Sequence, residues 1–364
     1  MEYVQERVAT LHDYGGDPPE APTDRAAVVV PMTEREYGTW ATERTLSTLS
    51  ALDPGRVIVP LRASPDAVSD FEAWLAGFDL PLEVLWCSGE SLEALLDARG
   101  LDGEAGKGRD VWLALGVATT DHPFVVCHDA DVRSYEAADV SRLLAPLEWG
   151  FAFSKGYYAR VENDRLYGRL CRLLYRPLVR ALSDRHDAPV LDYLGAFRYA
   201  LAGEFAATAQ VARGLRVERR FGLEVGTLGG TFDLAGFDGT AQVDLGRYEH
   251  DHRAVSGPDG LADMSDDVAA AVLRVVEAHG VEPDYESLPA AFREAAGALV
   301  RGYDADARFN GLTYEAAEER EQVDRYAEAV HPPGTDDRLP AWDAVDLEPS
   351  TVLEAARADL DSVQ

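Results

Sequence analysis

The sequence predicts an α/β fold with a parallel sheet, and three observations support this prediction. Short apolar runs alternate with helical stretches, which is the pattern of βαβ units. The runs at 26–30, 56–61, 82–87 and 124–127 are apolar almost throughout, as strands buried on both faces are. The run at 124–127 leads directly into Asp129 and Asp131. In open α/β sheets, ligands bind at the carboxyl ends of strands, so these aspartates mark a candidate site.

The remaining elements follow in order along the chain. Residues 1–24 are polar and proline-rich, and we expect a loosely docked leader. Helical spacing predicts helices at 39–52 and 65–77, and a further helix opens at 109. In the second half we expect an amphipathic helix at 163–182, a turn at 192–197 and a strand at 241–246. Residues 265–300, 313–330 and 350–360 are predicted to be helical, and 331–349 is a linker rich in proline and aspartate.

Composition limits the classes of protein to be considered. The chain has 364 residues, of which 46% are hydrophobic, enough for one large domain or two. Its net charge of −31 argues against nucleic-acid partners and anionic membrane surfaces, which need a basic stripe. No apolar run approaches 18 residues and no signal peptide is evident, so we expect a cytoplasmic protein. The three cysteines, Cys87, Cys127 and Cys171, are far apart and are expected to be buried thiols.

The basic residues are unevenly chosen. Lysine occurs only at Lys107 and Lys155, and every other basic residue is arginine. An acidic, lysine-poor, alanine-rich chain is typical of a salt-loaded cytoplasm, where salt screens the repulsion between acidic groups. This pattern predicts a halophilic protein. It also singles out the two lysines, because an ammonium is a compact point charge that arginine does not mimic.

Asp129 and Asp131 are candidate metal ligands. In extended geometry, residues two apart point the same way, so the two carboxylates share one side. Mg²⁺ and Mn²⁺ favour such oxygen ligands and are commonly held by one or two carboxylates together with substrate phosphates. The alternative is a plain surface turn, in which aspartate is common.

Lys107 lies in a Gly106-Lys107-Gly108 segment directly before a predicted helix. Such a segment can bring backbone amides and a cation close to a phosphate. The spacing does not match a P-loop, and a flexible turn is the alternative.

Three further groups carry candidate chemistry. Glu224 lies in an apolar frame and is either a helix-start residue or a site residue. His250 and His252 follow a predicted strand, and one of them could complete a metal shell with the aspartates. Arginines recur every three or four residues along 163–182. Most are expected to pair with the acidic surface, while one or two could bind an anionic substrate. These are Arg165, Arg169, Arg172, Arg176 and Arg180.

Together, the ordered motifs resemble the GT-A glycosyltransferases that make glucosyl-3-phosphoglycerate, and their relatives the mannosylglycerate synthases. The similarity covers about residues 26–255. The motifs are Val30-Pro31, Gly106-Lys107-Gly108, Asp129-Ala130-Asp131, Lys155 on the next strand, and Gly168-Arg169 upstream of Tyr175-Arg176-Pro177-Leu178. The segment 193–197 is a partial match to a Pro-Leu-Gly/Ser-Gly-Glu turn of the family. The last two motifs are Gly222-Leu223-Glu224-Val225-Gly226 and the segment 242–246 followed by His250.

The resemblance implies a GT-A nucleotide-sugar fold over residues 25–255 and a helical C-terminal extension over 256–364. The nucleotide-sugar half would be 25–135 and the acceptor half 136–255. It implies a homodimer that binds Mg²⁺ or Mn²⁺. The enzyme would transfer a hexose, with glucose as the expected one, from a UDP- or GDP-sugar to 3-phosphoglycerate or a similar small anionic acceptor. The anomeric configuration would be retained, and the product would be a compatible-solute precursor.

The resemblance also implies residue roles. Pro31 and Glu34 would border the nucleotide, and Lys107 would help to hold it. Asp131 and His250 would bind the metal. The catalytic residues would be Glu224, near the transferred sugar, and Asp129, close to the ribose or sugar. The acceptor-binding residues would be Gly168, Arg169, Lys155 and His252.

Three departures from the family pattern bear on the substrates. Ala196-Phe197 replaces a Gly-Glu pair, Cys171 replaces a threonine, and Tyr248 stands where the pattern has arginine, with Arg247 displaced by one. Two alternatives stay open at this stage. One is an inverting GT-A transferase with a lipid-phosphate or glycan acceptor and Glu224 as general base. The other is a non-catalytic nucleotide-sugar-binding protein, since fold does not fix function.

Overall fold

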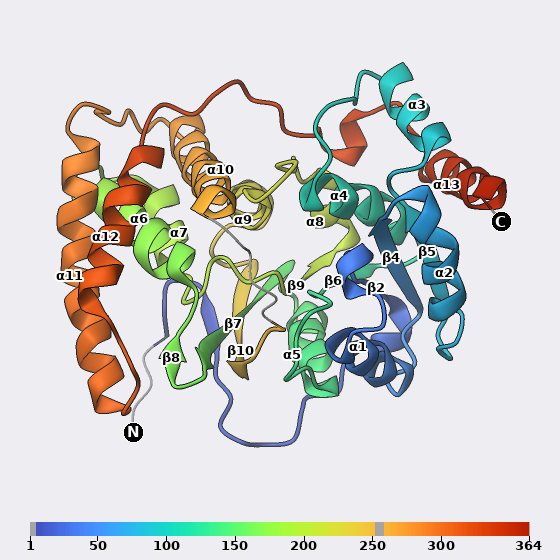
Figure 1. Cartoon of the computed structure of the whole chain (residues 1–364), viewed down its shortest axis with the longest axis horizontal. Helices are drawn as coiled ribbons and strands as arrows, with labels where there is room; N and C mark the ends of the chain where they lie inside the picture. The colour runs from blue at the N-terminus through green and yellow to red at the C-terminus, as the bar shows by residue number, and fades with distance from the viewer. Residues whose placement is uncertain (1–4, 252–257, 364) are drawn as a thin grey trace.

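The computed structural model describes residues 5–251 and 258–363 (Figure 1). Within these ranges the chain builds one ten-stranded sheet with helices packed on it. The strands are β1 Ala9–Leu11, β2 Ala26–Val29, β3 Met32–Thr33, β4 Arg56–Arg62, β5 Leu82–Trp86, β6 Phe124–Cys127, β7 Phe153–Glu162, β8 Arg165–Leu166, β9 Phe205–Thr208 and β10 Thr240–Tyr248.

Thirteen α-helices are present in the described ranges. They are α1 Trp40–Ser50, α2 Pro65–Leu75, α3 Glu90–Ala98, α4 Lys107–Ala118, α5 Ala137–Glu148, α6 Arg176–Ser183, α7 Pro189–Ala196, α8 Ala209–Gly214, α9 Leu223–Leu234, α10 Pro258–Ala278, α11 Leu288–Phe309, α12 Ala316–Tyr326 and α13 Pro349–Val363. A π-helix over Leu170–Tyr175 runs into α6. None of the described helices has the length and apolar character that a membrane crossing needs.

The strand order is β1-β10-β7-β9-β6-β2-β4, with β3 and β5 both paired to β4 and β8 paired to β7. The α/β prediction is confirmed, and the four predicted apolar strands form the parallel set β6-β2-β4-β5. The sheet is mixed, however, because β9 runs antiparallel to both β6 and β7. The strand predicted at 241–246 is β10, which runs parallel to β7.

Three sequence-based expectations need correction. The first 24 residues are not merely a leader, because β1 pairs with β10 at the edge of the sheet. The stretch 163–182 is not one helix: it contains β8, a left-handed glycine at Gly168 (φ 78°), the π-helix and α6. In the predicted turn at 192–197, residues 192–196 are helical and belong to α7, where Tyr193 and Leu194 are fully buried.

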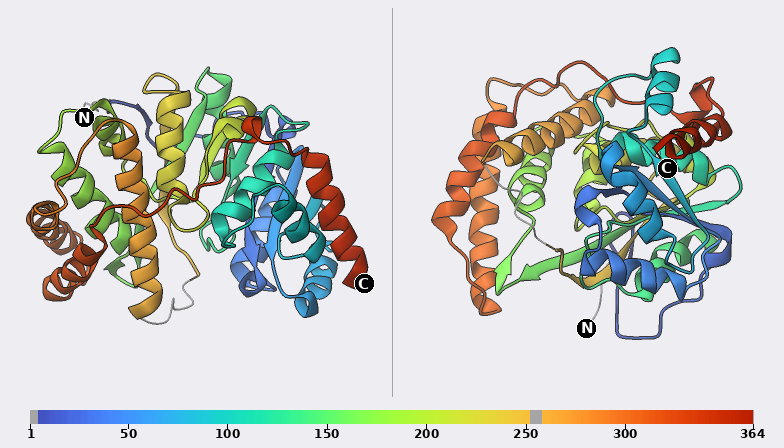
Figure 2. Two further views of the ribbon diagram at one scale, coloured as in Figure 1. Left: turned by 90° about the horizontal axis from the view of Figure 1, so that it is seen from above. Right: turned by 45° about the vertical axis from the view of Figure 1, so that its right-hand side comes forward.

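Two apolar cores lie on opposite faces of the sheet, and helices cover both faces (Figure 2). Strand β2 shows how this arises. Ala27 and Val29 point into the core that contains α4, whereas Ala26 and Val28 point into the core that contains α5. Because successive side chains alternate between faces, a strand between two cores must be apolar throughout.

Helix α4 is deeply buried, with every residue from Gly108 to Ala118 buried. Its start lies against the segment 218–220. A Cβ on Gly106 would lie 2.5 Å from the carbonyl oxygen of Arg219. The glycines beside Lys107 therefore allow two backbones to approach each other, and the lysine is held at the start of the helix.

The segment after α10 contacts elements from widely separated parts of the chain. After α12 the chain crosses back, so that α13 lies beside α3 and α2 (Figure 1). On the way Trp342 stacks on Trp112 of α4, with ring centroids 4.4 Å apart. In α13, Asp359 accepts hydrogen bonds from the backbone amides of Ser91 (2.8 Å) and Leu92 (3.0 Å) and so caps α3.

Candidate active site

The centre of the site is the loop after β6, which pairs with the segment after β10. The amide of Arg133 donates to the carbonyl of Glu249 (2.7 Å), and the amide of Asp251 donates to the carbonyl of Asp131 (2.7 Å). Val132 and His250 form an isolated antiparallel bridge between these two hydrogen bonds. This pairing places His250 beside the two aspartates, although His250 lies about 120 residues after them in the sequence.

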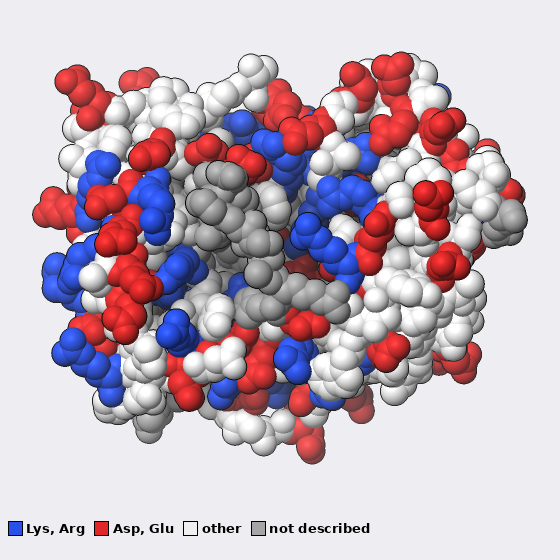
Figure 3. All heavy atoms as spheres, in the orientation of Figure 1, with Lys and Arg blue, Asp and Glu red and all other residues white. Residues whose placement is uncertain are grey.

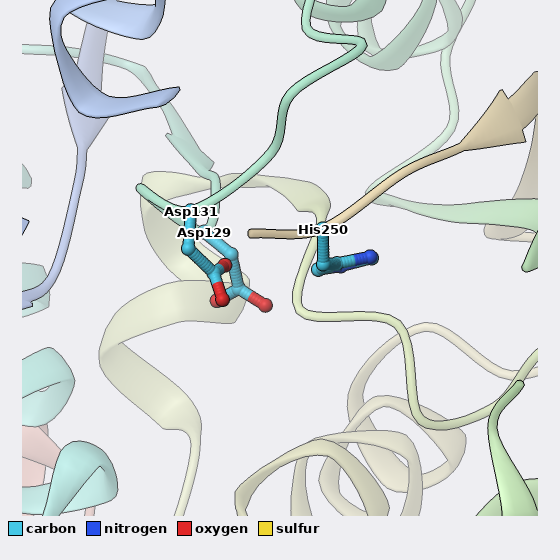
Figure 4. Close-up of side chains that lie close together, drawn as sticks. All are labelled: Asp129, Asp131 and His250. Carbon is cyan, nitrogen blue, oxygen red and sulfur yellow. The ribbon is translucent and has the colours of Figure 1, made fainter. Parts of the chain in front are cut away.

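Asp129, Asp131 and His250 have ligand atoms within 4.8 Å of one another. The two carboxylates lie together and His250 approaches from the neighbouring segment (Figure 4). Burial and the adjacent Asp129 raise the pKa of Asp131 to about 7, as expected when two carboxylates lie close together in a buried place. Two carboxylates and one imidazole are donors that suit Mg²⁺ or Mn²⁺, so the residues present fit such an ion.

Lys107 joins the aspartate loop to α9. Its Nζ donates to Oδ1 of Asp129 at 2.6 Å and lies 3.2 Å from Oε1 of Glu224. Burial disfavours the charged ammonium, but Asp129 and Glu224 outweigh it and hold the pKa of Lys107 well above its usual value. The side chain is therefore a fixed positive charge in the site.

Glu224 combines both roles considered for it. It is the second residue of α9, so it is a helix-start residue, where a negative charge is favoured by the helix dipole. It also lines a cavity and contacts Lys107, which places it in the site.

Two cavities meet at this cluster and share Lys107, Asp129, Asp131 and two further residues, Arg220 and Phe221. The first, of about 490 Å³, is bordered by Pro31 and the residues after it. The second, of about 610 Å³, is lined by Glu224, His250 and the stretch 165–171. Basic side chains gather around the hollow in the middle of this face, although the chain as a whole is acidic (Figure 3).

The predicted nucleotide-side residues are only partly brought together. Pro31 and Lys107 line the first cavity. Glu34 does not line it, because its carboxylate accepts a hydrogen bond from the amide of Ser64 at the start of α2. Glu36 lines the cavity in its place and is fixed by hydrogen bonds from the amide (2.6 Å) and hydroxyl (2.7 Å) of Thr33. The sequence signal was available, since Thr33 and Glu36 form a capping box.

The predicted acceptor-side residues also differ in position. Gly168 and Arg169 line the second cavity, but Nε of Arg169 is bound to Oε1 of Glu319 at 2.8 Å. Lys155 lies beneath the site, only 1% exposed, and donates to the carbonyl of Ala202, so its burial argues against direct contact with an acceptor. His252 is outside the described residues.

A turn at 201–204 is the main site element that the sequence reasoning missed. A Cβ on Gly203 would lie 2.5 Å from Oδ2 of Asp129, so this turn presses directly on the carboxylate. Its residues Leu201-Ala202-Gly203-Glu204 carry the Leu-x-Gly-Glu order that was sought at 193–197, seven residues earlier. A Gly-Glu pair is therefore present at Gly203-Glu204, and the segment 201–204 is a second candidate for the turn of the family pattern.

Glu204 is a buried carboxylate at the end of this turn. It is fully buried, and neither carboxylate oxygen has a hydrogen-bond partner among the residues that the structure describes. Burial first, and then the nearby charge of Asp129, raise the pKa of Glu204 to about 8. Its protonated form is therefore favoured near neutral pH.

Comparison with known proteins gives relatives along nearly the whole chain. The glucosyl-3-phosphoglycerate synthase of Methanococcoides burtonii is 32% identical over 94% of this chain and 93% of its own length. The enzyme of the same name from Persephonella marina is 34% identical over 74% of this chain and 70% of its own length. No protein-family model matches the chain.

Solved structures of a similar protein cover most of the fold. Glucosyl-3-phosphoglycerate synthase from Mycobacterium tuberculosis in complex with Mn²⁺, UDP-glucose and phosphoglyceric acid has a TM-score of 0.58 and 26% identity. The match covers 77% of this chain and 90% of that chain. Its complex with Mg²⁺ and UDP gives a TM-score of 0.58 and 27% identity, over 76% and 88% of the two chains.

Proposed function

We propose substrates and residue roles for this chain, which belongs to the glucosyl-3-phosphoglycerate synthase family, as its relatives show. It is a hexosyltransferase with the GT-A fold, and its activity depends on Mg²⁺ or Mn²⁺. We take UDP-glucose as the donor and 3-phosphoglycerate as the acceptor, because complexes of the similar mycobacterial enzyme contain both. The single observation that carries this proposal is the cluster of Asp129, Asp131 and His250 beside Lys107.

The donor occupies the two cavities that meet at this cluster. We place the nucleotide in the cavity bordered by Pro31, and the glucose beside Glu224 in the second cavity. When bound, the metal ion supplies positive charge that neutralises the diphosphate. Asp131 and His250 hold that ion, and Asp129 lies close to the ribose or the sugar. Lys107 adds a second fixed positive charge for the departing diphosphate.

The transfer then follows from where the charges lie. The bond between the anomeric carbon and the diphosphate oxygen breaks, and positive charge develops on the sugar ring. The carboxylate of Glu224 stabilises that charge. The acceptor hydroxyl attacks from the leaving-group side, its proton passes to the departing phosphate oxygen, and the configuration is retained. This route requires no enzymic base.

Other features of the proposal depend on composition and resemblance. The acidic, lysine-poor chain supports a halophilic enzyme working in a cytoplasm, with its product serving as a compatible-solute precursor. A homodimer formed through the C-terminal helices is proposed from the resemblance, and light scattering of the full chain tests it.

The function is tested by a turnover assay at high salt with Mn²⁺. UDP-glucose, GDP-glucose and GDP-mannose are each paired with 3-phosphoglycerate, glycerate and glycerol phosphate. We expect glucose transfer from UDP-glucose to 3-phosphoglycerate, and NMR of the product should show the donor's anomeric configuration. Asp131→Asn should abolish turnover, whereas Asp121→Asn, at the opposite end of β6, should leave it unchanged. Failure of every donor and acceptor pair would refute the proposal.

A further inference from the structure

A third cavity, of about 520 Å³, lies between the end of β7, the π-helix and α11. Its described lining includes five arginines and a single aspartate, Asp306. The arginines are Arg160, Arg172, Arg176, Arg198 and Arg247. In a chain whose net charge is −31, such an excess of positive charge around one cavity is exceptional. It produces a local field that attracts anions.

For Arg176, Arg198 and Arg247, nearby carboxylates do little to cancel that field. Arg198 and Arg247 pair with Glu6 (3.1 Å) and Glu249 (3.1 Å), but all four side chains are more than 40% exposed, and such pairs are weak. Arg176 has no ion pair among the described residues, and its Nη1 donates to the backbone carbonyls of Phe197 (2.8 Å) and Gly195 (3.3 Å).

Arg172 differs from the others because each of its three nitrogens already donates to a protein oxygen, which uses three of its five N–H donors. It binds Glu319 at 3.0 Å and the carbonyls of Tyr167 (3.0 Å) and Leu166 (3.3 Å). It contributes charge to the cavity but has little left to offer a ligand. Contacts to a ligand must therefore come from the other four arginines.

The third cavity is continuous in its lining with the second, which is also lined by Gly168 and Arg169, the residues that the resemblance assigns to the acceptor. Tyr158, Arg160, Cys171 and Tyr199 are among the residues that border both cavities. Arg169, the arginine that the resemblance assigns to the acceptor, is bound to Glu319 instead. An acceptor that extends from the second cavity past Cys171 would thus enter the third cavity and meet its arginines.

We propose that this arginine cavity binds the phosphate of the acceptor and makes the enzyme selective for a phosphorylated hydroxy acid. Arg160, which borders both cavities, and Arg176, which has no carboxylate partner among the described residues, are the residues we assign to that phosphate. Arg198 and Arg247 lie at the exposed side and draw the anion in. The inference rests on the proposed function and specifies which groups recognise the acceptor.

The test compares two arginines on one helix. Arg176→Gln should raise KM for 3-phosphoglycerate about 10- to 100-fold, the effect of losing a hydrogen bond to a charged group. KM for UDP-glucose and turnover with glycerate, which lacks the phosphate, should not change. Arg180→Gln is the matched control, because Arg180 is exposed one turn further along α6 and does not line the cavity. It should behave as the wild type.

Arg176→Gln also removes two backbone contacts, so a second variant guards against a structural effect. Arg198→Gln loses only an exposed ion pair and a ring contact, and it should also raise KM for 3-phosphoglycerate selectively. In addition, inorganic phosphate should compete with 3-phosphoglycerate in the wild type and more weakly in both variants. If both variants keep wild-type KM values and phosphate inhibition, the inference is overturned. If the wild type transfers glucose to no acceptor, the proposed function fails instead, and calorimetric binding of phosphate by wild type and variants still judges the cavity.

Discussion

The contact between Gly203 and Asp129 gives the sharpest prediction. In Gly203→Ala, the new Cβ would lie 2.5 Å from Oδ2 and 2.6 Å from Cγ of Asp129. Non-bonded carbon atoms prefer separations of about 3.5–4.0 Å, so the carboxylate must withdraw by about 1 Å. Its hydrogen bond from Lys107, now 2.6 Å long, would then exceed the usual limit of about 3.2 Å. Gly203 does not have a positive φ, so backbone strain does not complicate the result.

A displacement of 1 Å in an active site can reduce the rate about 100-fold. We therefore expect kcat/KM of Gly203→Ala to fall about 100-fold, equivalent to about 2.7 kcal/mol. The Mn²⁺ concentration for half-maximal activity should rise about 10- to 100-fold, as when the support of a metal ligand is removed. Both quantities are measured in an initial-rate assay with Mn²⁺ titrated at saturating substrates.

Gly195→Ala is the matched control for this experiment. Gly195 is exposed in α7, and its new Cβ would lie 3.9 Å from the nearest atom outside the helix, Cγ1 of Val179. Activity should be unchanged, and stability should rise by about 0.5–1 kcal/mol because alanine favours a helix. If Gly203→Ala keeps the wild-type rate and the wild-type metal requirement, then Asp129 does not depend on the turn and the reasoning is wrong.

Three further predictions concern the charges around the site. Lys107→Arg should lower kcat about 100-fold without unfolding the protein, because a planar guanidinium cannot replace a point charge held between two carboxylates; wild-type turnover would contradict this. Burial raises the pKa of Glu204 to about 8, so the folded protein holds this proton more tightly than the unfolded chain does. The free energy of unfolding should therefore fall as pH rises from about 4.5 towards 8, by about 1.4 kcal/mol per pH unit. Urea unfolding at pH 5.5 and 7.5 should show that Glu204→Gln loses less unfolding free energy between these two pH values than the wild type does. Equal losses would refute the raised pKa of Glu204. Glu319→Gln should cost about 3–5 kcal/mol, since Glu319 is 4% exposed and binds two arginines, while exposed Glu318→Gln should change thermal stability little.

Much of the site could be predicted because its residues follow local rules. The apolar strand and the aspartates that follow it, Asp129 and Asp131, can be recognised within nine residues, 124–132. The carboxyl end of a strand is where such sheets bind ligands. Lys107 could be singled out because it precedes a predicted helix and is rare in this chain. In each case the neighbours in sequence are also the neighbours that matter in space.

The errors arose where distant segments decide the structure. β1 has three residues, and only its pairing with β10 makes it a strand. Glu34 and Glu36 are equally acidic in the sequence, and the hydrogen bonds of Ser64 and Thr33 decide which of them faces the cavity. The arginines along 163–182 have helical spacing, yet a left-handed glycine and a two-residue strand interrupt the helix.

Both lysines of this chain make contacts in the surroundings of Asp129. Lys107 binds its carboxylate directly and links it to Glu224. Lys155 donates to the carbonyl of Ala202, and Ala202 precedes the glycine that presses on the same carboxylate. Both ammonium groups lie in confined places, where one reaches between two carboxylates and the other reaches a backbone oxygen in the loop before β9. A compact charge on a flexible stem suits such places, whereas a guanidinium needs room for a planar fork of five donors. A chain that uses arginine everywhere else would thus keep lysine at the position that binds Asp129 and at the position that binds the backbone beside Gly203.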